Sequence, residues 1–238
     1  MINGKSILVI IPARGGSKGL PGKNIKKMCG KPLISWTIEN ALNSQYVDKV
    51  IVSSDDEEII KISNTYGAET PFVRPDDLAT DNATSFPVIK HAIEFLHDNY
   101  ENQYDIIIMM EPTSPLREPN DIDVMLEKFN ADYDAADSII SIGLVAEHPS
   151  IIKKIDGNLL KPFVDNLPMT MRRQDQSPAY FPYGVAYIAK RDALLKEKTF
   201  YTIKCLHHTI KRYQCYEIDD IYDFITTENI MRYEWKLN

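Results

Sequence analysis

The sequence predicts an α/β fold built on a doubly wound, mostly parallel sheet. Short, continuously apolar runs alternate with helical patterns through the first 140 residues, and strands that are covered on both faces have this uninterrupted apolar character. A length of 238 residues with 44% apolar content allows one domain with a sizeable core. We therefore expect a single domain over residues 1–238, with one inserted segment over about residues 144–181.

The elements of the first part follow from the spacing of apolar residues. The predicted strands are residues 7–11, 50–52, a short strand near 71–73, 106–110 and 138–142. Apolar side chains three and four positions apart predict the intervening helices. In chain order, these helices should bury Ile34, Ile38, Ala41 and Leu42; Ile59, Ile62 and Tyr66; Ile89, Ala92, Ile93 and Leu96; and, after Asn120 as the cap, Ile122, Met125, Leu126 and Phe129.

The alternation of strands and helices stops at about Leu144. Residues 151–160 have the pattern of a hairpin around Asp156-Gly157, and a polar stretch containing proline follows. We expect this segment to project from the main domain. Residues 185–189 then return to the sheet, and residues 217–223 open a final helix with Ile221, Phe224 and Ile225 facing inward.

Composition excludes several classes of protein. A net charge of −7 argues against a nucleic-acid binder, which needs an excess of basic surface. No apolar stretch approaches the roughly 18 residues that a membrane span requires. The three cysteines show no Cys-x-x-Cys spacing, and residues 1–5 are too short for a targeting segment. We expect a cytoplasmic protein with no membrane and no nucleic-acid partner.

A glycine-rich loop follows the first predicted strand and carries Arg14, Lys18 and Lys23. Glycines let the backbone approach an anion closely, and the cations can pair with phosphate oxygens at the carboxyl end of a strand. The loop fits neither the P-loop nor the dinucleotide-binding pattern, because Asn24 follows Gly22-Lys23 and the glycine spacing differs. It predicts binding of a nucleoside triphosphate; the alternative is a solvated basic loop.

The loop resembles the signature of the acylneuraminate cytidylyltransferases, the CMP-sialic acid synthetase family. Ala13 to Asn24 match Ala-Arg-x-x-Ser-Lys-Gly-Leu-Pro-x-Lys-Asn at every specified position. The resemblance implies a Rossmann-like nucleotidyltransferase sheet whose insertion is a dimerisation arm. It implies catalytic roles for Arg14, Lys18 and Lys23. It also implies nucleotide binding by Ala13, Arg14, Gly15, Ser17, Lys23, Asn24, Arg74 and Ala83.

The second block of the resemblance runs from Arg74 to Ser85. In the family, Arg74 and the backbone near Ala83 would read the cytosine edge, and Ser85 would lie near the sugar. Taken alone, the block favours a structural alternative, in which Arg74 is an ordinary surface residue and Asp81 or Ser85 caps the next helix.

The third block is Glu111-Pro112-Thr113-Ser114-Pro115-Leu116-Arg117, after the predicted strand 106–110. The family usually has Gln at the first position, which contacts the acceptor sugar. Glu111 departs from that pattern, and a carboxylate accepts hydrogen bonds where an amide also donates them. It either faces a hydroxyl or amide of a differently decorated sugar or acts as a base.

The fourth block contains Glu217 and Asp219, where the family carries two Asp. Two carboxylates at i and i+2 suit Mg²⁺, which prefers a few carboxylates together with substrate phosphates. The resemblance implies that Mg²⁺ bound here helps pyrophosphate leave. The local alternative is that Asp219 or Asp220 caps the final helix, with Asp223 in its first turn.

The inserted segment matches the sugar-pocket region of the family imperfectly, because Phe181 joins Pro182 directly where many members have an intervening Arg. The resemblance implies sugar binding by Arg173, Gln174, Tyr180 and Phe181, with Arg173 as the candidate for the sugar carboxylate. It also implies a homodimer.

Together these blocks imply a Mg²⁺-dependent cytidylyltransferase. It would join CTP and a nine-carbon 2-keto acid sugar of the sialic, legionaminic or pseudaminic type, giving a CMP-sugar and pyrophosphate. The alternatives are a CMP-Kdo synthetase or another sugar nucleotidyltransferase, and a catalytically inactive nucleotide-binding protein of the same fold.

Overall fold

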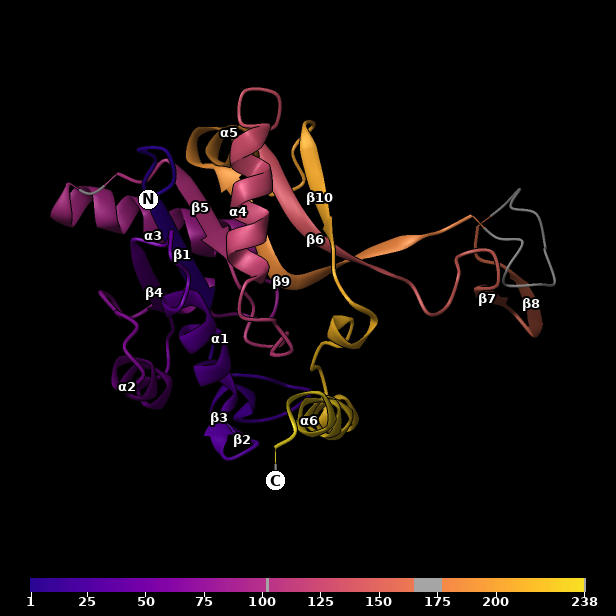
Figure 1. Cartoon of the computed structure of the whole chain (residues 1–238). Coiled ribbons are helices and arrows are strands. Elements are labelled where there is room, and N and C mark those ends of the chain that lie inside the picture. The colour runs from indigo at the N-terminus through magenta and orange to yellow at the C-terminus, as the bar shows by residue number, and fades with distance from the viewer. Residues whose placement is uncertain (102, 165–176, 238) are drawn as a thin grey trace.

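The computed structural model describes residues 1–101, 103–164 and 177–237. A six-stranded sheet has the order β10-β6-β9-β5-β1-β4. Its strands are β1 (Ile7–Pro12), β4 (Lys49–Ser53), β5 (Ile106–Met109), β6 (Ser138–Leu144), β9 (Tyr180–Lys190) and β10 (Cys205–Thr209). β1 is parallel to β4 and β5, and β10 is parallel to β6, whereas β9 runs antiparallel between β5 and β6. The mostly parallel α/β sheet is therefore confirmed (Figure 1).

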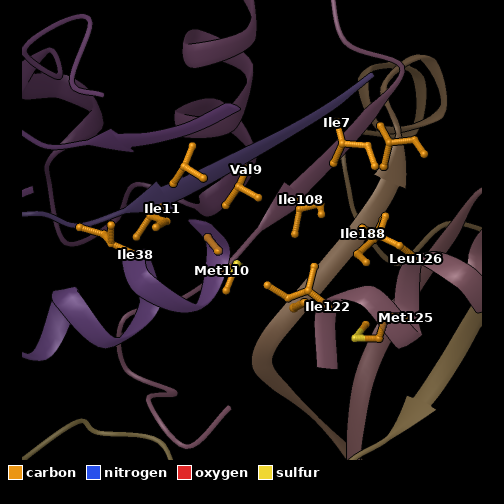
Figure 2. Packing of buried hydrophobic residues seen from close by; sticks show 14 of the residues in the cluster. Ile7, Val9, Ile11, Ile38, Ile108, Met110, Ile122, Met125, Leu126 and Ile188 are labelled. Atoms are coloured by element: carbon orange, nitrogen blue, oxygen red, sulfur yellow. The ribbon is translucent and has the colours of Figure 1, made fainter. Parts of the chain in front are cut away.

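Helices cover both faces of this sheet. They are α1 (Leu33–Leu42), α2 (Glu57–Thr65), α3 (Ser85–Tyr100), α4 (Asp121–Ala131), α5 (Arg191–Glu197) and α6 (Ile221–Trp235). Because successive strand residues point to opposite faces, Val9 and Ile11 of β1 pack in the cluster that contains α1 and α4, and Ile10 packs in the cluster that contains α3 and α5. Figure 2 shows the first cluster, with Ile38 of α1 near the end of β1.

Three details of the predicted elements are wrong. Residues 71–73 form no strand; an isolated bridge joins Ile51 to Glu69 instead, and Pro71 has no N–H to donate to a ladder. Leu42, the last residue of α1, is 46% exposed.

In α6, Ile221 and Ile225 point outward at 39% and 50% exposure. The buried face is Phe224, Thr227 and Met231. Phe224 and Met231 pack in one cluster with Met28 and with Leu20 of the glycine-rich loop. Of the three residues predicted to face inward, Phe224 does and the two isoleucines do not, because α6 packs with Phe224 and Met231 on Leu20 and Met28.

Two short strands and two longer elements were not predicted. β2 (Lys27–Met28) and β3 (Lys31–Pro32) pair with each other. Helix α5 follows β9, and β10 forms one edge of the six-stranded sheet. Among the described residues, none of the helices combines the length and the apolar character that crossing a membrane requires.

The predicted hairpin around Asp156-Gly157 is present. β7 (Lys153–Asp156) pairs with β8 (Leu159–Pro162), and Gly157 has the positive φ of 60° that a tight turn needs. The hairpin projects from the main body at the far end of β6 and β9 (Figure 1). The extent of the inserted segment stays a prediction.

Candidate active site

The first and third blocks directly follow β1 and β5, and Arg74 of the second block is hydrogen-bonded to Ser53 and Ser54 at the end of β4. These three strands are parallel, and β1 lies between β5 and β4. Their carboxyl ends meet at one edge of the sheet, where open α/β sheets bind ligands. Residues 13–24, which we call the phosphate loop, leave β1 at this edge. The first three blocks of the sequence therefore converge as the fold class requires.

The phosphate loop is held in shape by its own polar groups. The buried Asn24 donates from Nδ2 to the carbonyl of Arg14 over 3.0 Å. The N–H of Gly15 donates to Asp55 over 3.1 Å, and a Cβ at Gly15 would lie only 2.7 Å from Asp56 Oδ2. Glycine is thus required there for close packing, and the predicted contact of Asn24 with a base stays a prediction.

Two cations of this loop pair with one carboxylate. Arg14 Nη1 lies 2.7 Å from Asp81 Oδ1, and Lys18 Nζ lies 2.5 Å from Asp81 Oδ2. Both cations hold the pKa of Asp81 below its usual range, with the Lys18 contact as the largest cause. Asp81 does not cap α3, whose cap residue is Thr84.

Lys23 joins the phosphate loop to the fourth block. Its Nζ donates to the carbonyl of Ile218 over 2.6 Å and lies 3.7 Å from Asp219 Oδ1. Only 12% of the Lys23 side chain is exposed. Burial lowers the pKa of this ammonium, and Asp219 opposes that effect. A cation and a carboxylate from opposite ends of the chain therefore meet at the predicted phosphate site.

Arg74 is buried, at 4% exposure, so the surface alternative for this residue is wrong. Its Nε donates to the Ser53 hydroxyl over 3.0 Å, and its Nη2 donates to the Ser53 carbonyl. Burial lowers the pKa of Arg74 to about 10, with Asp55 opposing, so it stays charged at neutral pH. The guanidinium anchors the loop that starts at residue 74 to the end of β4.

Arg117, at the end of the third block, organises the edge between β5 and β9. It is 3% exposed and donates to the carbonyls of Glu111, Gly184 and Val185 and to the hydroxyl of Thr37, over 2.5 to 2.8 Å. A planar guanidinium has the fork of donors that this set of acceptors requires. Arg117 therefore fixes the backbone that carries Glu111.

Glu217 and Glu111 both contact Gly184. Glu217 Oε1 accepts from the Ser114 hydroxyl over 2.8 Å and from the Gly184 N–H over 2.6 Å. The Glu111 carboxylate packs so closely against Gly184 that a Cβ there would collide with its Oε2. Among the described residues, no hydrogen bond reaches the Glu111 carboxylate. Burial, followed by the charge of Glu217, raises the pKa of Glu111 to about 7, with Arg117 opposing.

A cavity of about 400 Å³ adjoins Glu111. Its lining comes from the start of α3, the end of β5, β9 and the segment after α5, and includes Ser85, Glu111, Tyr187, Lys198 and Tyr201. Two of the predicted sugar-binding residues, Ser85 and Glu111, are thus brought together. The tyrosines and Lys198 belong to no motif, and no pattern in the sequence points to them.

Two of the other predicted sugar-binding residues lie outside this cavity. Tyr180 and Phe181 are each 50% exposed and pair with the end of β6, and neither lines this cavity. Arg173 and Gln174 lie outside the described residues. Any sugar contact by these four residues stays a prediction.

The carboxylates of the fourth block are free of the capping role. The cap of α6 is Asp220, which accepts from Tyr222 and Asp223, while Asp223 accepts in return from Asp219 and Asp220. Glu217 and the 91% exposed Asp219 are therefore available as oxygen ligands. The described residues hold no group of three or more His, Cys, Asp or Glu side chains with metal-binding geometry. Two carboxylates suit Mg²⁺ that is shared with substrate phosphates, rather than a closed protein site.

The raised pKa of Glu111 makes a prediction for stability. An acid whose pKa is higher in the folded protein loses stability as pH rises from its ordinary value through the raised one, here from 4.5 to about 7. Glu111→Gln removes that loss. We expect the variant to exceed the wild type at pH 8 by at most about 3 kcal/mol and to match it near pH 4.5. Urea unfolding at both pH values measures this, and an equal difference at the two pH values would contradict it.

Comparisons with known proteins show what this chain is similar to. A family model described as cytidylyltransferase matches residues 8–235. A CMP-N,N'-diacetyllegionaminic acid synthase of Legionella pneumophila is 35% identical over 233 residues, covering 94% of this chain and 96% of its own length. A pseudaminic acid cytidylyltransferase of Campylobacter jejuni is 38% identical over 220 residues, covering 91% and 92%.

A further relative is longer. An N-acylneuraminate cytidylyltransferase of Escherichia coli is 34% identical over 218 residues, which are 92% of this chain and 50% of that protein. Among solved structures, a CMP:2-keto-3-deoxy-manno-octonic acid synthetase complexed with CTP aligns with a TM-score of 0.69 at 19% identity, covering 96% of this chain and 99% of that one. That likeness supports the fold.

Proposed function

The chain belongs to the cytidylyltransferase family, and from that premise we propose that it joins CTP to a nonulosonic acid, giving a CMP-sugar and pyrophosphate. The main support for this proposal is that the phosphate loop, the pair Glu217 and Asp219, and the Glu111 cavity share one edge of the sheet. The relatives act, by their names, on legionaminic, pseudaminic and acylneuraminic acids. The acceptor is therefore an acid sugar of the sialic, legionaminic or pseudaminic type.

The reaction needs charge stabilisation and positioning rather than a protein nucleophile. The anomeric hydroxyl of the sugar attacks the α-phosphorus of CTP, and the bond to the leaving pyrophosphate breaks. Arg14, Lys18 and Lys23 stabilise the charge that develops on the phosphates. The backbone at Ala13, Gly15 and Ser17 approaches the phosphates, while Asn24, Arg74 and Ala83 lie toward the base. Ser85 and Glu111 contact the acceptor from their cavity.

We assign Mg²⁺ to Glu217 and Asp219, whose oxygens fit a hard cation that also binds phosphate. When bound, the ion neutralises phosphate charge. Glu217 is held in place by Ser114 and Gly184, whereas Asp219 reaches solvent beside Lys23. The pair thus combines one fixed and one exposed carboxylate.

Asp219→Ala tests this assignment. We expect turnover to fall at least tenfold at a fixed Mg²⁺ concentration, and the Mg²⁺ concentration for half-maximal activity to rise, because one of two protein ligands is lost. Pyrophosphate release over a Mg²⁺ titration measures both. Asp134→Ala, which removes an exposed carboxylate far along the chain, is the control. An unchanged Mg²⁺ dependence would remove Asp219 from the metal site.

The proposed function itself is tested by sugar-dependent pyrophosphate release. The acceptors are N-acetylneuraminic, legionaminic, pseudaminic and Kdo sugars, each with CTP and with GTP. Turnover with CTP and one nonulosonic acid is the expected result. Preference for Kdo or for GTP would overturn the assignment, and so would CTP binding without turnover on any acid. Including Glu111→Gln in the panel shows whether this carboxylate sets the ranking of sugars.

We also propose that the chain is a homodimer joined through its projecting hairpin. Ile155, Leu159 and Leu160 on β7 and β8 are 80%, 66% and 74% exposed, and Phe163 beyond them is 59% exposed. Contiguous exposed apolar surface of this kind indicates an interaction site. A second copy of the chain offers the same surface, as a symmetric interface requires.

Leu160→Asp should convert the dimer to a monomer, because a charge would be buried at the interface without a partner. Size-exclusion chromatography with light scattering measures the mass. The matched control is Ile203→Asp, since Ile203 is 94% exposed and lies away from the hairpin. A wild-type monomer, or a dimer in the Leu160 variant, would contradict this interface.

A further inference from the structure

One segment bridges the site from β4 to α3. Residues 74–85, which we call the strap, are fixed at their first end by Arg74, whose N–H donates to the Ser54 carbonyl over 2.7 Å and whose side chain bonds to Ser53. At its other end, the strap continues directly into α3 at Ser85. Its middle part is exposed and carries Asp81. The strap is thus tethered at both ends, and its middle reaches the phosphate loop.

The contact between strap and phosphate loop consists of ion pairs. The two oxygens of Asp81 are divided between Arg14 and Lys18, at 2.7 and 2.5 Å. The Lys18 and Arg14 side chains remain 81% and 33% exposed, so solvent and anions can reach them. A carboxylate that bridges two cations satisfies the same donors that a phosphate group would take.

This arrangement places a negative charge where the proposed function requires the triphosphate. The phosphates and Asp81 cannot both occupy the donors of Arg14 and Lys18. Exposed ion pairs are weak individually, and a triphosphate offers more charge and more acceptor oxygens than one carboxylate. Replacement of Asp81 by the triphosphate is therefore favourable. The affinity for nucleotide is lower than it would be without Asp81, because the two ion pairs must first be broken.

We propose that Asp81 is a built-in competitor for the triphosphate, displaced from Arg14 and Lys18 when the nucleotide binds. This inference rests on the proposed function for the identity of the nucleotide. The strap is released with Asp81, which frees residues 79–84, including Ala83, to meet the base. Asp81 thus sets the affinity for nucleotide without taking part in the chemistry.

The test compares Asp81→Asn with Asp76→Asn. Both variants lose one negative charge from the strap, and Asp76 is exposed and has no ion pair among the described residues. Calorimetry gives the dissociation constants of inorganic tripolyphosphate and of CTP. Asp81→Asn should bind both about three- to tenfold more tightly than Asp76→Asn, as loss of two exposed pairs implies. Equal affinities of the two variants would overturn the proposal. Weaker binding by Asp81→Asn would also overturn it, because Asp81 would then hold the cations in their binding positions.

Amide hydrogen exchange provides a second readout. Tripolyphosphate should accelerate exchange in residues 76–84 of the wild type, because it releases the strap without supplying a base to order it. In Asp81→Asn, the same residues should exchange rapidly before any anion is added. Slower exchange in the wild type with tripolyphosphate would contradict displacement. Because tripolyphosphate carries neither cytosine nor sugar, these results do not depend on the sugar panel, and failure of either proposal can be recognised separately.

Discussion

Lys23→Ala is expected to lower kcat at least tenfold, which corresponds to about 1.4 kcal/mol of transition-state stabilisation. The Lys23 ammonium is 12% exposed, donates to the Ile218 carbonyl over 2.6 Å and lies 3.7 Å from Asp219. It therefore sits between the phosphate loop and the proposed metal ligands. A cation held in a partly desolvated site acts more strongly on developing phosphate charge than a solvated one. Steady-state kinetics of pyrophosphate release, with CTP and the acceptor identified in the panel, measures the loss.

Two further variants separate charge from packing. Lys23→Met retains most of the buried stem and should lose as much activity as the alanine variant, because the charge is the active feature. Lys27→Ala removes an exposed cation near the loop and should retain full activity. If Lys23→Met were as active as the wild type, Lys23 would be a structural link between the loop and residue 218, with no role in the reaction.

The core and the order of most elements could be predicted because local patterns determine them. The run 7–11 is apolar at every position, and a strand buried on both faces requires this. The direction of β9 could not be predicted, since a buried strand has the same apolar sequence pattern in parallel and in antiparallel pairing. Its direction depends on the long path through the hairpin. The inward face of α6 was predicted correctly at Phe224 and wrongly at Ile221 and Ile225, because an apolar side chain alone does not show which side of the helix packs against Leu20 of the phosphate loop.

In the candidate site, too, local motifs could be predicted from the sequence and the contacts between them could not. Motifs placed the phosphate loop and Glu111 after β1 and β5, and topology brings those loops to one edge of the sheet. The pair Glu217 and Asp219 lies just before α6, and hydrogen bonds of this segment to Lys23 and Ser114 bring it to the same edge. Contacts between blocks were not predictable from spacing. The Asp81 bridge depends on how far the strap reaches, and the Glu111 environment depends on Gly184, which lies 73 positions along the chain. Tertiary proximity determines these features.

Arg117→Ala should lower the free energy of unfolding by at least about 3 kcal/mol. Arg117 is 3% exposed and serves three carbonyls and one hydroxyl. Burial lowers its pKa to about 10, so it remains charged at neutral pH. Alanine would leave these buried acceptors without donors, and each unsatisfied group costs about 1–3 kcal/mol. Urea unfolding monitored by circular dichroism measures the change.

A milder variant keeps this prediction testable if the alanine variant does not fold. Thr37→Val removes one acceptor and retains the side-chain shape, so it should cost about 1 kcal/mol. Arg117→Lys retains the charge but lacks the fork of donors, and it should be nearly as unstable as Arg117→Ala. Full stability of Arg117→Lys would show that charge alone suffices at this position. The geometry argues otherwise, because one ammonium with three donors cannot serve four acceptors that a planar guanidinium now links across β9, α1 and the loop after β5.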